Sequence, residues 1–95
     1  MVYEWNAGKA KANIHKHGVS FDAAATVFLD PLALTFPDPY YSGEEREITI
    51  GYTAGHQVVF VSHCPRGDRV RIISARKATG RERKDYEEGI DKEFG

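Results

Sequence analysis

The amino-acid sequence predicts an α+β fold in which two N-terminal helices and one C-terminal helix pack on an antiparallel β-sheet. Helix-capping residues flank two short segments near the N-terminus, residues of alternating polarity fill the middle of the chain, and a second capping pattern precedes the C-terminal segment. The 95 residues suffice for one small core, so we expect a single domain over residues 1–95.

Two helices are predicted at the N-terminus. Asn6 can cap residues 7–17, whose composition, rich in alanine and lysine, suits a helix that stops at Gly18. Ser20 can cap a second, shorter helix, and Pro31 prevents its continuation. The apolar residues of the second helix fall on one face: Ala24, Val27 and Phe28.

Strands are predicted in the middle of the chain. Within residues 46–53 the apolar residues Ile48, Ile50 and Tyr52 alternate with the residues between them, which indicates a half-buried strand. Residues 37–45 are predicted as a loop from their proline, glycine and acidic content. The predicted strands lie at residues 33–36, 46–53, 57–64 and 69–75, and a turn at 65–68 joins the last two. Strict alternation in the last strand places Arg69, Arg71 and Ile73 on one face and Val70, Ile72 and Ser74 on the other.

The C-terminal helix is predicted from a capping box. Thr79 and Glu82 have the T-x-x-E spacing in which each side chain accepts a hydrogen bond from the other residue's backbone N–H. The helix therefore begins at Gly80 and runs towards Phe94.

Composition excludes several classes of protein. The longest apolar run, residues 58–61, is far too short for a membrane span, and the N-terminus is too polar for a signal peptide. Cys64 is the only cysteine, which excludes an intramolecular disulfide and a multi-cysteine metal site. We therefore expect a cytoplasmic protein with no contact to a membrane.

The formal net charge of −1 hides a strong polarity along the chain. Between residues 18 and 65 six acidic residues face Arg46 alone, whereas residues 66–84 hold eight basic residues against Asp68 and Glu82. The last helix would begin basic and end acidic, the reverse of what the helix dipole favours. Local helix stability does not account for this order, and binding of an anion would.

Several motifs give the chain a resemblance to a known family. Near the N-terminus they are W-x-x-x-K at the start of the first helix, the turn K-H-G-V-S-F and the exit F-x-D-P. Near the C-terminus the block R-I-I-S-A-R-K-A-T is followed by E-R and a tyrosine. Together they cover nearly the whole chain, which resembles the BrnT toxins of type II bacterial toxin–antitoxin pairs.

The resemblance implies a RelE-like fold and a ribonuclease activity that arrests translation. It also implies neutralisation by a BrnA-type antitoxin, through which alone the pair would contact DNA. The assembly is left open between a homodimer and a toxin–antitoxin heterotetramer. No cofactor is implied, and RNA is the expected substrate.

The basic segment then supplies the expected phosphate-binding residues. A ribonuclease without a metal must stabilise charge on the phosphoryl oxygens, and the planar guanidinium group of arginine can bind two of them at once. The alternative is a solvated basic face that forms ion pairs with the acidic loop. The candidates are Arg71, Arg76, Lys77, Arg81 and Arg83, together with Arg69.

The general acid and base stay unassigned. His17 has an unperturbed pKa near neutrality and stands in a family motif, but a histidine at a helix C-terminus commonly caps carbonyl groups instead. Because RelE-like enzymes often use basic residues and a tyrosine, Lys9, Arg76 and Tyr86 remain candidates. Tyr86 can equally be a core tyrosine, and Trp5 can be a core anchor or stack on a base.

A metal site is not predicted. His15 and His17 are two residues apart, so on a helix they point about 200° apart. His56 and His63 flank a strand without the further ligands that zinc requires.

Two functions of different classes follow from the basic segment. In the first, the chain is an endoribonuclease whose arginines form both the substrate site and the catalytic apparatus. In the second, the same surface binds RNA or an acidic protein without cleaving anything. A third function, direct DNA binding, is disfavoured because no helix-turn-helix motif with a basic recognition helix is found.

Overall fold

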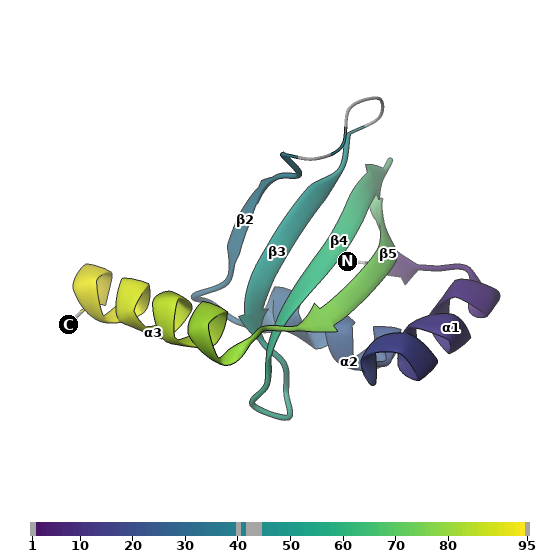
Figure 1. Cartoon of the computed structure of the whole chain (residues 1–95). Helices are drawn as coiled ribbons and strands as arrows, with labels where there is room; N and C mark the ends of the chain where they lie inside the picture. The colour runs from purple at the N-terminus through teal and green to yellow at the C-terminus, as the bar shows by residue number, and fades with distance from the viewer. Residues whose placement is uncertain (1, 40, 42–44, 95) are drawn as a thin grey trace.

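A computed structural model of the chain describes residues 2–39, 41 and 45–94. The described residues form three α-helices, one 3-10 helix and five strands (Figure 1). In chain order they are β1 (Val2–Glu4), α1 (Ala7–His17), α2 (Phe21–Ala25), the 3-10 helix η1 (Thr26–Leu29), β2 (Leu34–Pro37), β3 (Glu47–Tyr52), β4 (Val58–Arg66), β5 (Arg69–Lys77) and α3 (Gly80–Phe94).

The five strands form one sheet in the order β1-β5-β4-β3-β2. The neighbours from β5 to β2 are antiparallel, and β1 runs parallel to β5. The predicted α+β fold is therefore confirmed, with the addition of β1, which the sequence did not indicate. The predicted loop at 37–45 lies partly outside the described residues.

The local signals for the helices are all found in the structure. The Asn6 side chain accepts a hydrogen bond from the backbone N–H of Lys9, and Gly18 ends α1 with a left-handed φ of 69° that suits a residue without a side chain. The Ser20 hydroxyl accepts from the Ala23 N–H at 3.0 Å and so caps α2. Among the described residues, none of these helices is long and apolar enough to cross a membrane.

The main core lies between the N-terminal helices and one face of the sheet, which we call the helix-covered face. It includes Phe21 and Val27 from the helices and Val59, Val61 and Ile72 from the strands, all almost fully buried. Gly51 of β3 lies where η1 crosses the sheet, and a Cβ atom there would approach Val27 Cγ1 to 3.1 Å. The helices thus pack closely because this strand position has no side chain.

One histidine is buried in this core. The His63 Nε2 atom lies 2.7 Å from the Thr49 hydroxyl, and the Phe28 ring packs edge-on against the imidazole. Burial lowers the pKa of His63 below its ordinary value of 6.5, although nearby Glu47 opposes the shift. His63 therefore stays neutral in the folded chain at a pH at which an exposed histidine takes up a proton.

We expect the free energy of unfolding to fall as the pH drops below about 6.5, because the unfolded chain then binds a proton at His63 that the folded chain does not. Above that pH both states are neutral at this residue and the contribution is fully present. Urea denaturation between pH 5 and 7 measures the slope. His63→Gln should flatten it, whereas the exposed control His15→Gln should not. An unchanged slope in His63→Gln would contradict this account.

A β-bulge decides which side chains of β5 point away from the helices. The partners of β4 residues 60, 62 and 64 are Arg76, Ser74 and Arg71, so one extra residue of β5, Ile73, is inserted opposite the Ser62–His63 step. Because alternate residues of β4 share a face, Arg71, Ser74 and Arg76 share it too. We call this the open face. The strict alternation that the sequence predicts is wrong here, since it separates Ser74 from Arg71.

Candidate functional site

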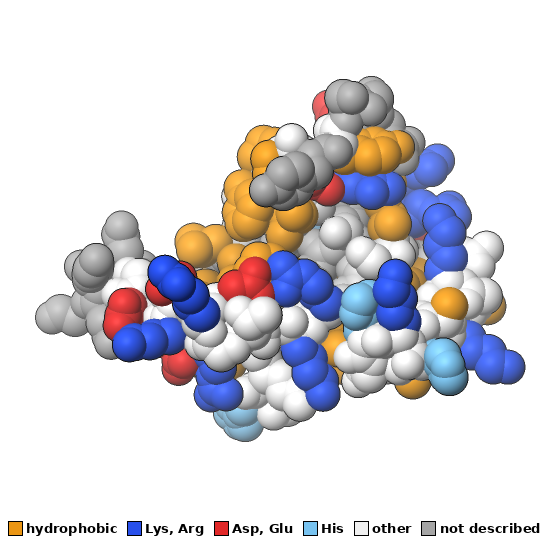
Figure 2. Space-filling model, in the orientation of Figure 1, with side chains coloured by type: hydrophobic (Ala, Val, Ile, Leu, Met, Phe, Trp, Pro, Cys, Tyr) orange, Lys and Arg blue, Asp and Glu red, His pale blue; other side chains and the backbone are white. Residues whose placement is uncertain are grey.

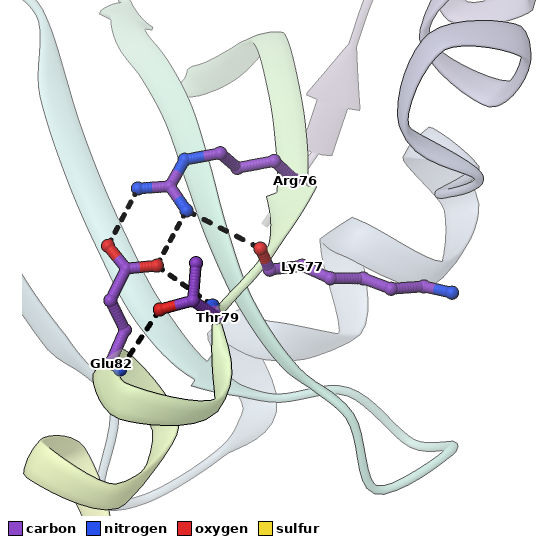
Figure 3. Close-up of polar contacts among 4 residues, drawn as sticks. All are labelled: Arg76, Lys77, Thr79 and Glu82. Atoms are coloured by element: carbon purple, nitrogen blue, oxygen red, sulfur yellow. Dashed lines mark hydrogen bonds and ion pairs between the residues drawn. The ribbon is translucent and has the colours of Figure 1, made fainter.

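Arg76 is the basic residue with the most elaborate surroundings on the open face. Its Nη1 and Nη2 atoms donate to the two carboxylate oxygens of Glu82 at 2.8 and 3.0 Å, a bidentate ion pair (Figure 3). Nη1 also lies 3.4 Å from the carbonyl oxygen of Lys77. The guanidinium carbon stands 4.3 Å from the centre of the Phe60 ring, its cross-strand neighbour. The side chain is thus held in one position while 43% of it stays exposed.

Glu82 belongs to the first turn of α3 and is itself fixed there. The Thr79 N–H donates to Glu82 Oε1 at 2.9 Å and the Glu82 N–H donates to the Thr79 hydroxyl at 3.2 Å, which confirms the predicted capping box. Hydrogen bonds from Arg76 and then from Thr79 lower the pKa of Glu82 to about 2. The carboxylate therefore stays ionised at every physiological pH, and it orients Arg76 as a permanent anion.

An apolar groove runs beside this ion pair, between the sheet and α3. It is lined by Leu34 and Phe36 of the edge strand β2, by Ile50 and Phe60 of the central strands, and by Glu82, Asp85 and Tyr86 of α3. Figure 2 shows hydrophobic side chains gathered over β2 and β3, bordered by a red and a blue group where α3 begins. The open face thus offers an apolar surface and a guanidinium group next to each other.

The C-terminal helix is anchored over one end of the open face. The Tyr86 hydroxyl donates to the Leu32 carbonyl oxygen at 2.9 Å, and its ring packs with Ile50 and Val58. The Tyr52 hydroxyl donates to Glu87 at 2.6 Å. Burial, followed by the charge of Asp30, raises the pKa of Tyr86 to about 12. These contacts favour the second interpretation of Tyr86, a core tyrosine that fixes α3, over a role in proton transfer.

The structure brings three of the predicted site residues to one face. Arg69, Arg71 and Arg76 all pair with even-numbered residues of β4 and so lie on the open face. Arg81 and Arg83 are exposed on α3, where Arg83 Nε donates to Glu87 at 3.2 Å. The surface formed by Arg69, Arg71 and Arg76 is called the arginine row below.

Other predicted site residues lie elsewhere. Lys9 and His17 belong to α1, which packs on the helix-covered face and lies on the other side of the sheet from α3 (Figure 1). Lys77 is one residue past Arg76 and therefore points to the helix-covered face, where its Nζ lies near Gly18. Trp5 packs against the main core, edge-on to Phe21, which fits a core anchor.

Two residues of the site were not predicted as functional from the sequence. The sequence indicates Glu82 only as part of a capping box, and Phe60 only as one apolar residue of a strand. The spacing Arg76-x-x-x-x-x-Glu82 across a strand end and a helix start is the one signal that could indicate the ion pair. In the part of the chain that the structure describes, no group of three or more His, Cys, Asp or Glu residues is arranged to hold a metal ion.

Comparison with known proteins shows the family to which this chain belongs. The model of the family described as "Ribonuclease toxin, BrnT, of type II toxin-antitoxin system" matches residues 5–82, most of the chain. The chain belongs to the BrnT family of ribonuclease toxins. Membership confirms the resemblance that the sequence motifs indicate. Because a type II ribonuclease toxin is paired with a protein antitoxin, it also implies an antitoxin partner and an RNA substrate.

A solved structure supports the assignment to BrnT. The chain is similar to the ribonuclease toxin BrnT of Brucella abortus, whose crystal structure superposes with a TM-score of 0.66 at 26% sequence identity. The similarity covers 83% of this chain and 99% of that chain. A search of curated proteins found no match. The residues matched by the BrnT family model include Arg71, Arg76 and Glu82 and stop before Arg83 and Tyr86.

Proposed function

We propose that this BrnT-family chain cleaves single-stranded RNA on its open face and needs no metal ion to do so. The ribose 2'-hydroxyl loses its proton as its oxygen attacks the adjacent phosphorus, the bond from phosphorus to the 5'-oxygen breaks, and that oxygen takes up a proton. The products are a 2',3'-cyclic phosphate and a 5'-hydroxyl end. Arg76 and Arg71 bind the nonbridging oxygens, on which charge accumulates in the transition state. The arrest of translation then follows from the cutting of messenger RNA.

The single observation that carries this proposal is the β-bulge in β5. It brings Arg76 to the same face as Arg69 and Arg71, beside the apolar groove. Arginine binds phosphate oxygens through paired N–H groups, and aromatic rings stack on unpaired bases. Phe36 is 38% exposed and lines the groove, so a base has an apolar surface to stack on within the same site.

Incubation of purified protein with a single-stranded RNA in EDTA tests the reaction. We expect cleavage products with 2',3'-cyclic phosphate ends. Cleavage that requires added magnesium would contradict metal independence. Binding of RNA without cleavage would favour the non-catalytic RNA-binding module or an enzyme that acts only on the ribosome.

We further propose that the antitoxin neutralises this chain by covering the groove and the arginine row. Leu34 is 56% exposed in the edge strand and lines the groove. An apolar surface beside an arginine is typical of the buried centre of a protein interface. A protein segment in the groove would stand directly against Arg76 and exclude RNA. Neutralisation is then steric and requires no conformational change of the toxin.

Leu34→Asp should weaken binding of the cognate antitoxin at least about tenfold, because a carboxylate would be buried in an apolar contact. Leu29→Asp is the matched control, since Leu29 is 79% exposed in η1 and does not line the groove. Isothermal titration calorimetry gives both dissociation constants. Equal affinities for the two variants would show that the antitoxin binds elsewhere.

A further inference from the structure

The hydrogen bonds of Arg76 leave one edge of its guanidinium group without a partner. A guanidinium has five N–H donors in a plane. Two on Nη1 point to Glu82 and to the Lys77 carbonyl, and one on Nη2 points to Glu82. Among the described residues no hydrogen bond uses Nε–H or the second proton of Nη2. These two protons lie side by side and form a second fork that matches two oxygens of a phosphate.

Figure 3 shows how this fork is directed. Every dashed line that reaches the guanidinium ends at one of its two Nη atoms, on the side of Glu82 and the Lys77 carbonyl, where the first turn of α3 begins. The opposite edge, with Nε, faces away from that turn. Glu82 therefore holds the guanidinium by one edge and leaves the other available on the open face.

We propose that Glu82 is a positioning residue of the nuclease, which acts through Arg76 by presenting the Nε–Nη2 fork to the scissile phosphate. The inference rests on the proposed function, because it assumes that Arg76 binds that phosphate. Arginine is a long side chain with many rotamers, and its ordering is needed before it can bind with two hydrogen bonds at once. Here Glu82, the Lys77 carbonyl and the Phe60 ring have ordered it before RNA arrives.

A different role for Glu82 would be that of a competitor that occupies the place of the phosphate. Two features oppose it. The carboxylate is bound to the edge formed by Nη1 and Nη2, so it does not block the Nε edge. The carboxylate is also held at the start of its own helix by the Thr79 N–H, and that helix is anchored by the hydrogen bond from Tyr86 to the Leu32 carbonyl. Displacement of Glu82 by RNA would have to break these contacts. A competitor predicts that removal of the carboxylate raises activity, whereas a positioning residue predicts a loss.

Glu82→Gln separates these roles, because the amide keeps the size of the side chain but loses the charge and the bidentate match. We expect kcat for RNA cleavage to fall roughly tenfold or more and KM to change less than about threefold, as misplacement of a catalytic group predicts. The matched control is Glu88→Gln, on the same helix, where an exposed glutamate lies 3.9 Å from Lys84. A rise in kcat/KM, no change in either constant, or an equal loss in Glu88→Gln would overturn the proposal.

A spectroscopic measurement keeps the inference testable even if the wild-type chain cleaves no RNA. The Arg76 Nε–H group gives its own signal in ¹⁵N-edited NMR spectra, assigned by its loss in Arg76→Lys. A single-stranded RNA with 2'-O-methyl riboses, which cannot be cleaved, should shift this signal in the wild type and shift it less in Glu82→Gln. A signal that RNA leaves unmoved in the wild type would overturn the positioning role. Absence of cleavage together with a shifted signal would overturn only the proposed reaction.

Discussion

Replacement of Arg76 by alanine is expected to lower kcat/KM for RNA cleavage roughly 100- to 1000-fold, the usual effect of removing one preorganised donor from a charged transition state. Arg76 combines a charge that is present at every relevant pH with a geometry that Glu82 and Phe60 fix. Arg76→Lys should recover little of the activity, because an ammonium group keeps the charge but cannot offer a planar fork. Initial rates on a fluorescent single-stranded RNA measure both variants.

The control for this prediction is a basic residue away from the open face. Lys11 is exposed on α1, so Lys11→Ala removes one positive charge without touching the groove. Its activity should stay within about threefold of the wild type, since distant surface charges contribute only screened, long-range attraction to RNA. If Arg76→Ala retained activity at the level of Lys11→Ala, while its melting temperature matched the wild type, Arg76 would not be part of the active site.

Replacement of Asn13 by alanine is expected to cost about 3 kcal/mol of unfolding free energy. The buried Asn13 side chain donates to the Val19 and Ala75 carbonyl oxygens at 2.9 and 2.8 Å and accepts from the Ala75 N–H at 3.1 Å. Because β1 pairs only with residues 69–71, the later residues of β5 have no neighbouring strand on that edge. The Asn13 amide takes the place of a strand there and forms hydrogen bonds with the backbone N–H and carbonyl of Ala75. Alanine would leave the Ala75 backbone groups buried and unpaired, next to Arg76.

Urea denaturation of Asn13→Ala and of Asn6→Ala provides the comparison. Asn6 caps α1 through one exposed hydrogen bond, so its loss should cost only about 1 kcal/mol. Asn13→Asp should be at least as damaging as Asn13→Ala, because it removes the donor and buries a carboxylate. A cost below about 1 kcal/mol for Asn13→Ala would mean that water replaces the amide at the edge of β5.

The helices could be predicted from the sequence because their signals are local. Asn6, Gly18, Ser20 and Thr79 each act within four residues of the backbone groups that they satisfy or of the helix that they end. The capping interactions therefore depend only on short segments of the sequence. They can be predicted without knowledge of the tertiary structure.

The sheet was only partly predictable for the opposite reason. β1 has three residues and exists through its parallel pairing with β5, more than sixty residues away in the sequence. The bulge at Ile73 likewise depends on the register with β4, and it shifts every following residue of β5 to the other face. Nothing in the alternation of residues 69–77 shows such an insertion.

The same limit applies to the candidate site. Arg69 and Arg71 could be placed on one face from the sequence, but Arg76 joins them only because of the bulge. Lys9 and His17 stand in family motifs near the N-terminus, yet the fold places their helix on the far side of the sheet. Motifs indicate which residues belong together in a family, whereas proximity depends on packing. A catalytic role for Lys9 and His17 stays a prediction, and neither residue lies next to the arginine row.

The most direct test of the account is to find which face of the chain RNA contacts. In NMR spectra of methyl-labelled protein, a single-stranded RNA with 2'-O-methyl riboses should shift the signals of Leu34 and Ile50, which line the groove. The signals of Val27, buried in the main core, and of Ile14, exposed on α1, should stay unmoved. Shifts at Ile14 with none at Leu34 would place RNA on the helical layer and contradict an active site on the open face.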